Sequence, residues 1–165
     1  MRKILFLSLL IQVVFSSCDK ENDAAVTVHC DGLVTDTAGT GDNGRVYMPN
    51  AFTPNSDGIN DISRPVTQNI AAIQFSVYDE NSNVVFTSST IGQGWNTTGS
   101  PNSAVKYYYR VQATTSSNRK IGICGELYKL SCFPNSIPRS SLFFEDQGTP
   151  WGFTGVTSEV MVNCP

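Results

Sequence analysis

Three segments in which apolar and polar residues alternate constrain the fold of this chain more than any other feature. They cover residues 73–78, 83–87 and 105–115. Alternation with a period of two is typical of strands with one buried face. Clusters of Gly, Asn, Ser and Pro follow these segments at residues 79–83, 92–102 and 115–118, and such residues favour turns. The pattern predicts an all-β fold, with short-turn connections typical of a sandwich.

The size and charge of the chain narrow its function. With 165 residues, of which 40 % are apolar, it is long enough for one well-packed domain. Eleven basic against 14 acidic side chains give a net charge of −3, which argues against a nucleic-acid partner. The sequence has a single histidine, His29, so histidine-based acid–base catalysis has almost no candidate residues. Glu145 and Asp146 are adjacent and are expected in a turn, so the chain is not expected to be an enzyme.

The N-terminus has the features of an export signal. Two basic residues precede an apolar run and a pair of small residues, and residues 1–17 are therefore predicted to be a signal peptide. Residues 15–18 resemble the lipobox of bacterial lipoproteins, which implies that Cys18 receives a lipid; the alternative is an ordinary signal peptide followed by a chance cysteine. Residues 18–25 are predicted to be a disordered tether. Its charged residues 19–23 resemble a surface-export signal, the alternative being a plain linker, so we expect a lipid-anchored outer-membrane protein exposed at the cell surface.

The other four cysteines are predicted to form two disulfides. An even number of cysteines in an exported chain favours disulfides, and C-x-x-C zinc spacing is absent from the sequence. If residues 120–132 form one strand, Cys124 and Cys132 lie about 26 Å apart and cannot pair with each other. Of the two remaining connectivities we favour Cys30 with Cys124 and Cys132 with Cys164, because the second bond would attach the C-terminal residues to the strand they leave.

Residues 46–61, with the sequence VYMPNAFTPNSDGIND, resemble the opening of the gliding-motility-associated C-terminal domain family. Further family features follow in the expected order: F-x-V-Y-D at 75–79, V-V-F at 84–86, a Gly-Trp turn at 94–95, a Tyr-rich strand at 106–110, and a last strand at 120–130. The resemblance covers about residues 45–132. It implies an immunoglobulin-like antiparallel β-sandwich, here assigned to residues 26–132, and a family whose members often carry type IX secretion sorting signals in Bacteroidota.

The resemblance leads us to expect the fold but not the sorting role. Sorting domains end their chains, whereas about 33 residues follow Cys132, and type IX cargo is not normally held by its own N-terminal lipid. Residues 133–165 are rich in large apolar side chains and are predicted to fold as a C-terminal extension packed on the sandwich. We therefore expect a non-catalytic docking module for an outer-membrane complex of the secretion, motility or biogenesis type. The alternative is a carbohydrate-binding surface module.

The opening motif contains a candidate calcium loop. Asn55, Asp57 and Asp61, with the carbonyl of Ile59, follow the alternate-residue spacing of oxygen ligands around a glycine. Thr53 and Arg64 stand where such loops carry acidic residues, so binding would be weak. The favoured alternative is an Asx-turn loop in which these side chains accept bonds from backbone amides. Calcium is the one cofactor considered; otherwise none is expected.

Aromatic residues supply the remaining candidates. Trp95, in the family turn, is expected to be a hydrophobic plug, whereas Trp151 is flanked by Pro and Gly and is the candidate for partner contact. Alternation places Tyr108 on the face of its strand opposite to Tyr107 and Tyr109. His29 is expected on the surface at a strand end.

Overall fold

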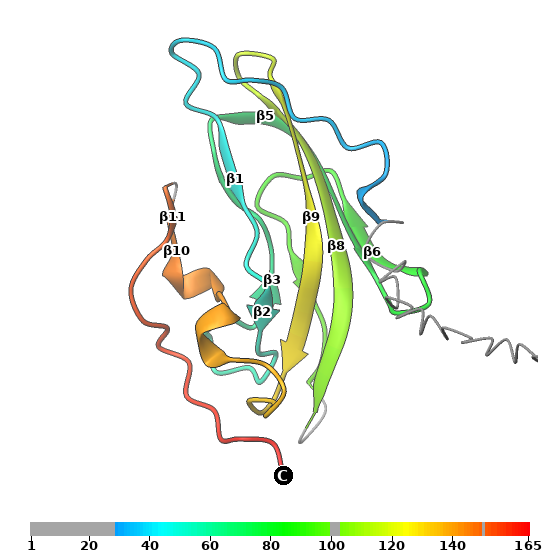
Figure 1. Cartoon of the computed structure of the whole chain (residues 1–165), viewed down its shortest axis with the longest axis vertical. Coiled ribbons are helices and arrows are strands. Elements are labelled where there is room, and N and C mark those ends of the chain that lie inside the picture. The colour runs from blue at the N-terminus through cyan, green and yellow to red at the C-terminus, as the bar shows by residue number, and fades with distance from the viewer. Residues whose placement is uncertain (1–28, 100–102, 150) are drawn as a thin grey trace, which may run out of the picture.

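A computed structural model describes residues 29–99, 103–149 and 151–165 (Figure 1). The described residues are almost entirely strands, turns and extended segments, with two one-turn 3-10 helices. No helix among them is long and apolar enough to cross a membrane. The strands are β1 (Arg45–Tyr47), β2 (Ala51–Phe52), β3 (Ile62–Ser63), β4 (Val66–Gln68), β5 (Ile70–Tyr78), β6 (Val84–Ser88), β7 (Trp95–Asn96), β8 (Ala104–Thr115), β9 (Lys120–Leu130), β10 (Gly148–Thr149) and β11 (Gly152–Phe153).

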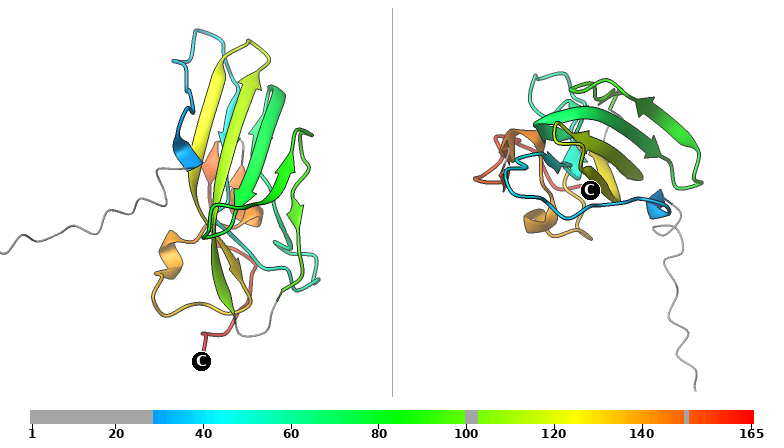
Figure 2. Two further views of the ribbon diagram at one scale, coloured as in Figure 1. Left: turned by 90° about the vertical axis from the view of Figure 1, so that its right-hand side faces the viewer. Right: turned by 90° about the horizontal axis from the view of Figure 1, so that it is seen from above.

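A five-stranded sheet in the order β2-β9-β8-β5-β6 is the largest element of the fold. Its long strands β5, β8 and β9 lie side by side (Figure 2). Strands β5, β6 and β8 match the three segments expected from alternation, and β9 matches the last strand implied by the family resemblance, which confirms the prediction of an all-β sandwich. The sheet is antiparallel except at one edge, where β2 pairs with β9 in parallel. Two parallel strands must be joined by a long crossover connection. Here that connection is the chain between β2 and β9, which also contributes β5, β6 and β8 to the same sheet.

Two small sheets, β1-β4 and β3-β7, cover one face of the large sheet and complete the sandwich. Between the layers lies a buried cluster whose members are Val46, Met48, Phe52, Ile73, Phe75, Val77, Trp95, Val111, Ala113, Ile121 and Leu127. The Trp95 ring lies 5.4 Å from that of Phe52 and 4.8 Å from that of Tyr107. Trp95 is therefore the expected hydrophobic plug, and Tyr107 and Tyr109 pack against the same cluster.

The extension folds onto the sandwich at the β2 edge. Phe133, Leu142 and Phe144 form a second buried cluster with Ala51 and Leu130 of the sheet. The extension forms two 3-10 helices, η1 (Arg139–Ser141) and η2 (Glu145–Gln147), and the β10-β11 hairpin. Packing against the sheet removes the large apolar side chains of this second cluster from water.

Both disulfides follow the favoured connectivity. Cys30 bonds to Cys124 in β9, and Cys132 bonds to Cys164 near the end of the extension. The second bond closes a segment that also carries a parallel bridge between Phe133 and Asn163. The extension is thus attached to the end of β9 both covalently and by backbone hydrogen bonds.

Residues 29–36, which we call the strap, cross the outer face of the large sheet. Arg110 donates from Nη1 to the carbonyls of His29 (3.1 Å) and Asp31 (2.6 Å). Gly122 of β9 lies so close beneath the strap that a Cβ there would stand 2.9 Å from Leu33 Cβ. The close approach requires glycine, and the Cys30–Cys124 bond attaches the strap two residues further along β9.

The expectation of a surface histidine was wrong. His29 is buried, with its ring 4.3 Å from that of Tyr78 and 5.1 Å from that of Tyr108. Burial lowers the pKa of His29. Alternation placed Tyr108 on the face of β8 opposite to Tyr107 and Tyr109, and the structure shows that this face is covered by the strap.

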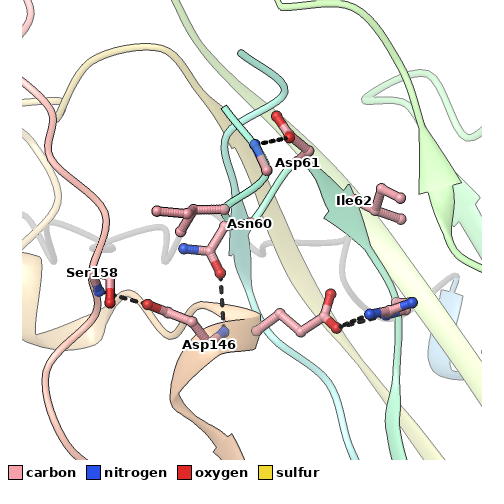
Figure 3. A pocket seen from close by; sticks show the side chains of 9 residues that line it. Asn60, Asp61, Ile62, Asp146 and Ser158 are labelled. Atoms are coloured by element: carbon pink, nitrogen blue, oxygen red, sulfur yellow. Dashed lines mark hydrogen bonds and ion pairs between the residues drawn. The ribbon is translucent and has the colours of Figure 1, made fainter. Parts of the chain in front are cut away.

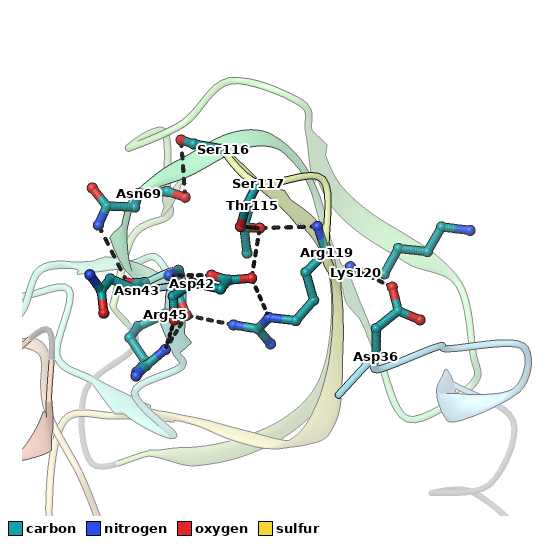
Figure 4. Close-up of polar contacts among 11 residues, drawn as sticks. Asp36, Asp42, Asn43, Arg45, Asn69, Thr115, Ser116, Ser117, Arg119 and Lys120 are labelled. Atoms are coloured by element: carbon teal, nitrogen blue, oxygen red, sulfur yellow. Dashed lines mark hydrogen bonds and ion pairs between the residues drawn. The ribbon is translucent and has the colours of Figure 1, made fainter. Parts of the chain in front are cut away.

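A partly buried ion pair holds the far end of the β8-β9 hairpin (Figure 4). Arg119 Nε lies 2.7 Å from Asp42 Oδ2, and Arg119 Nη2 donates to the carbonyl of Gly44 (2.8 Å). Thr115 Oγ1 also donates to Asp42. The hydrogen bond from Arg119 is the first of several that hold the pKa of Asp42 well below its usual range. This network ties the segment before β1 to the hairpin at the end opposite the extension.

Candidate functional site

Residues 53–61, which we call the signature loop, are folded around the carboxylate of Asp61. Its Oδ1 accepts the amides of Asn55 (3.0 Å) and Ser56 (2.6 Å), and its Oδ2 accepts that of Gly58 (2.8 Å). Gly58 has a φ of +89°, which favours glycine at this turn. One carboxylate thus binds three amides of its own loop and holds the turn together from inside.

Asn55 and Asp57 also accept bonds from backbone amides. Asn55 Oδ1 accepts the amide of Asp57 (3.0 Å), and Asp57 Oδ1 accepts that of Ile59 (2.8 Å). The three side chains considered as calcium ligands therefore make the Asx-turn contacts of the alternative interpretation. Within the described part of the chain, no three His, Cys, Asp or Glu side chains are grouped to hold a metal.

The extension is joined to the opening motif first at Asn50. Asn50 Nδ2 donates to the carbonyl of Ser141 (2.8 Å), and Asn50 Oδ1 accepts the amide of Phe143 (2.7 Å). The Phe143 carbonyl accepts the amides of Asn50 (3.0 Å) and Ala51 (3.2 Å). These bonds hold residues 141–143 beside the start of β2.

A second attachment is made at a buried carboxylate, Glu159, which is 8 % exposed. Its Oε2 accepts a bond from Thr53 Oγ1 at 2.5 Å and from Asn60 Nδ2 at 3.3 Å. Its Oε1 is buried and has no hydrogen-bond partner among the described residues. The carboxylate therefore attaches residue 159 to both ends of the signature loop.

Asp146 completes the junction between loop and extension (Figure 3). Its amide donates to Asn60 Oδ1 (3.0 Å), and its carboxylate accepts the amide of Ser158 and the hydroxyl of Thr157. Neighbouring Glu145 pairs with Arg64, with Nη2 2.5 Å from Oε1. A cavity of about 440 Å³ lies between these groups and the loop. Glu145 and Asp146 lie in η2, where both carboxylates hold the extension in place.

Burial raises the pKa of Glu159. The bonds from Thr53 and Asn60 act in the opposite direction, and the nearby carboxylates of Asp57 and Asp146 add to the rise. A carboxyl whose pKa is higher in the folded state stabilises the fold most below its unfolded pKa, near 4.5, and loses that contribution as pH rises through its folded pKa.

Glu159→Gln is therefore expected to change the pH dependence of stability. In the parent protein the buried Glu159 carboxyl ionises as the pH rises, which lowers the parent's Tm. The glutamine does not ionise, so the Tm of the variant minus that of the parent should increase from pH 4 towards neutrality. Thermal unfolding of both proteins across this range measures the difference. Glu80→Gln, in an exposed turn, is the control for loss of one negative charge. A Tm difference for Glu159→Gln that is flat or falls with pH would contradict the assignment.

Trp151 lies on the exposed surface of the extension, with 69 % of its surface accessible. Val156, Val160 and Val162 are also strongly exposed in the following segment. The structure thus leaves Trp151 accessible for the partner contact predicted for it. Cys18 lies outside the described residues.

The sequence did not mark Asn50, Thr53, Asn60 or Glu159 as functional. Asn50, Thr53 and Asn60 belong to the opening motif, and this was the only feature of the sequence that could have pointed to them. Glu159 is a single carboxylate in a segment of alternating residues, and nothing in that pattern distinguishes it from a solvent-exposed glutamate.

Residues 46–125 match the family model described as the CHU_C type IX secretion signal domain. No curated protein and no solved structure matches the chain. The match implies a role related to type IX secretion and a secreted or cell-envelope-associated protein. The match covers the signature loop, β2, β5, β6, β8 and the first part of β9, and it ends before the extension. The resemblance seen in the opening motif is thereby confirmed, and residues 46–125 of this chain are similar to the CHU_C type IX secretion signal domain.

Proposed function

We propose that this protein is a non-catalytic, lipid-anchored accessory module at the surface of the outer membrane, where it docks onto a membrane protein complex of the secretion, motility or biogenesis type. The observation that supports this most is the extension. It packs on the signature loop of a type IX secretion signal domain and directs Trp151, Val156, Val160 and Val162 outward. Large apolar side chains gathered on an exposed segment are typical of a protein contact surface.

Affinity capture from detergent-solubilised native membranes tests this function. We expect the full chain to retain an integral outer-membrane protein, and Trp151→Ser and Val160→Ser to lose it. Val84→Ser is the matched control, since Val84 is also exposed but lies on β6, away from the extension. Equal capture by all four proteins would contradict the docking role. Binding of the parent protein, but not of Trp151→Ser, to a glycan array would instead support the carbohydrate-binding alternative.

Cys18→Ala is expected to release the protein from the membrane fraction. The lipid on Cys18 is proposed to be the anchor, because the charged tether after it has no apolar face with which to bind a bilayer. Fractionation of cells grown with a labelled fatty acid measures both lipidation and release. Cys18→Ala protein that still carries label would contradict the lipobox assignment, and unlabelled protein that resists a carbonate wash would show that another contact provides the anchor.

A further inference from the structure

The extension itself contains a second cavity, of about 350 Å³. Its walls include Phe133, Leu142 and Phe144, apolar side chains of the second buried cluster that are each 6 % exposed or less. The rest of the lining consists of Arg139, Ser140, Gln147, Glu159 and residues 155–157. A cavity of this size, with mainly apolar walls and a few polar groups, is the usual form of a small-molecule binding site.

Among the larger polar side chains of this lining, Glu159 has an acceptor that the protein does not use. Gln147 bonds to backbone groups at both ends of its amide. Arg139 donates to Asn163 Oδ1 (2.7 Å) and lies over the ring of Phe133, and within the described part of the chain it forms no ion pair with Glu159. Glu159 is 8 % exposed, and its Oε1 has no hydrogen-bond partner among the described residues. A buried acceptor without a donor is costly, so a ligand that supplies the donor is favoured there.

The charges around Glu159 indicate what kind of donor fits. Its Oε2 already accepts bonds from Thr53 and Asn60, so Oε1 is the atom left for a ligand. The carboxylates of Asp57 and Asp146 are close enough to act on the Glu159 carboxyl, which makes its surroundings favourable for a positive charge. An ammonium group combines that charge with the strongest kind of hydrogen bond to a carboxylate.

We propose that this cavity binds a small primary amine with an apolar body. The body packs against Phe133, Leu142 and Phe144, and the ammonium group donates to Glu159 Oε1. The ligand leaves the bonds of Oε2 to the signature loop in place and satisfies the remaining oxygen. The site lies outside the residues that match the family model and does not depend on the membrane complex proposed above.

The test compares two probes of the same shape, 2-phenylethylamine and 2-phenylethanol, of which only the amine is charged at pH 7. Each is titrated into the full chain and followed by amide chemical shifts in NMR spectra. We expect saturable shifts at Ser140, Gly155 and Val156, in the lining of the cavity. The amine should bind about tenfold more tightly than the alcohol, because its bond to Glu159 joins two charged groups.

Glu159→Gln should bring the affinity ratio of the two probes to about onefold, because glutamine keeps an acceptor for Thr53 but carries no charge. Glu80→Gln, in an exposed turn, is the matched control and should keep the tenfold ratio. Equal binding of the two probes by the parent protein would overturn the proposal. Shifts that do not saturate, or a tenfold ratio retained by Glu159→Gln, would overturn it as well.

A second variant tests the cavity if Glu159→Gln does not fold. Ser140 is an exposed lining residue, and Ser140→Trp places a large ring in the cavity mouth without changing the carboxylate. We expect it to weaken binding of both probes at least fivefold. Ser89→Trp, at an exposed serine beyond the end of β6, is its control and should bind as the parent does. Undiminished binding by Ser140→Trp would show that the probes bind elsewhere and would overturn the assignment.

Discussion

Replacing Cys30 and Cys124 together by serine is expected to lower the free energy of unfolding by about 4–5 kcal/mol. The bond joins residues 94 apart in sequence, so it removes much of the freedom of the unfolded chain. It also holds the strap over the outer face of the sheet, where His29 is buried against Tyr78 and Tyr108. Chemical denaturation of the parent and the double variant measures the loss.

The matched control is the replacement of Cys132 and Cys164 by serine. These residues are 32 apart, and the shorter loop predicts a loss about 1 kcal/mol smaller. Hydrogen exchange should locate the two effects differently, in the strap for the first variant and in the extension for the second. An unfolding free energy for the Cys30 and Cys124 variant equal to that of the parent would contradict the expected role of this bond.

Trp95→Ala is expected to lower the free energy of unfolding by about 3–5 kcal/mol, since it leaves a large cavity between the two layers of the sandwich. Trp95 is 8 % exposed and belongs to the buried cluster. Its removal leaves the rings of Phe52 and Tyr107 without their common neighbour. Urea denaturation should show a lower midpoint with an unchanged slope, because the variant exposes nearly the same surface on unfolding.

Trp151→Ala is the control for loss of an indole ring, and we expect its unfolding free energy to change by no more than about 0.5 kcal/mol. Trp151 is 69 % exposed, so its removal leaves no cavity in the core. Comparable losses for the two tryptophans would show that the described packing does not account for stability.

Several features of this protein were determined by its sequence alone. The strands β5, β6 and β8 could be predicted because each alternates over enough residues for one face to be buried and the other not, and β9 was implied by the family resemblance. The sequence reduced the three possible disulfide connectivities to two, because an extended strand keeps Cys124 and Cys132 too far apart to bond. The opening motif pointed to the matching family model because its residues follow one another in a specific order.

Other features depended on contacts between residues distant in sequence. The parallel pairing of the two-residue strand β2 with β9 has no local signal, because two residues show no periodicity. His29 is buried because the strap crosses the tyrosines of β5 and β8, and a single residue near a cysteine gives no indication of that path.

The junction between the extension and the signature loop is the clearest case. Thr53 and Glu159 are 106 residues apart, and their hydrogen bond forms only because the extension returns to the β2 edge, where its apolar side chains pack. Local propensity acts over a few neighbouring residues, whereas burial of a carboxylate depends on which surfaces meet after the chain has folded. The sequence by itself determined the long strands and the family resemblance, because both are written in runs of neighbouring residues. Only the tertiary structure decided between the two disulfide connectivities and brought the motif residues and Glu159 together to hold the extension in place.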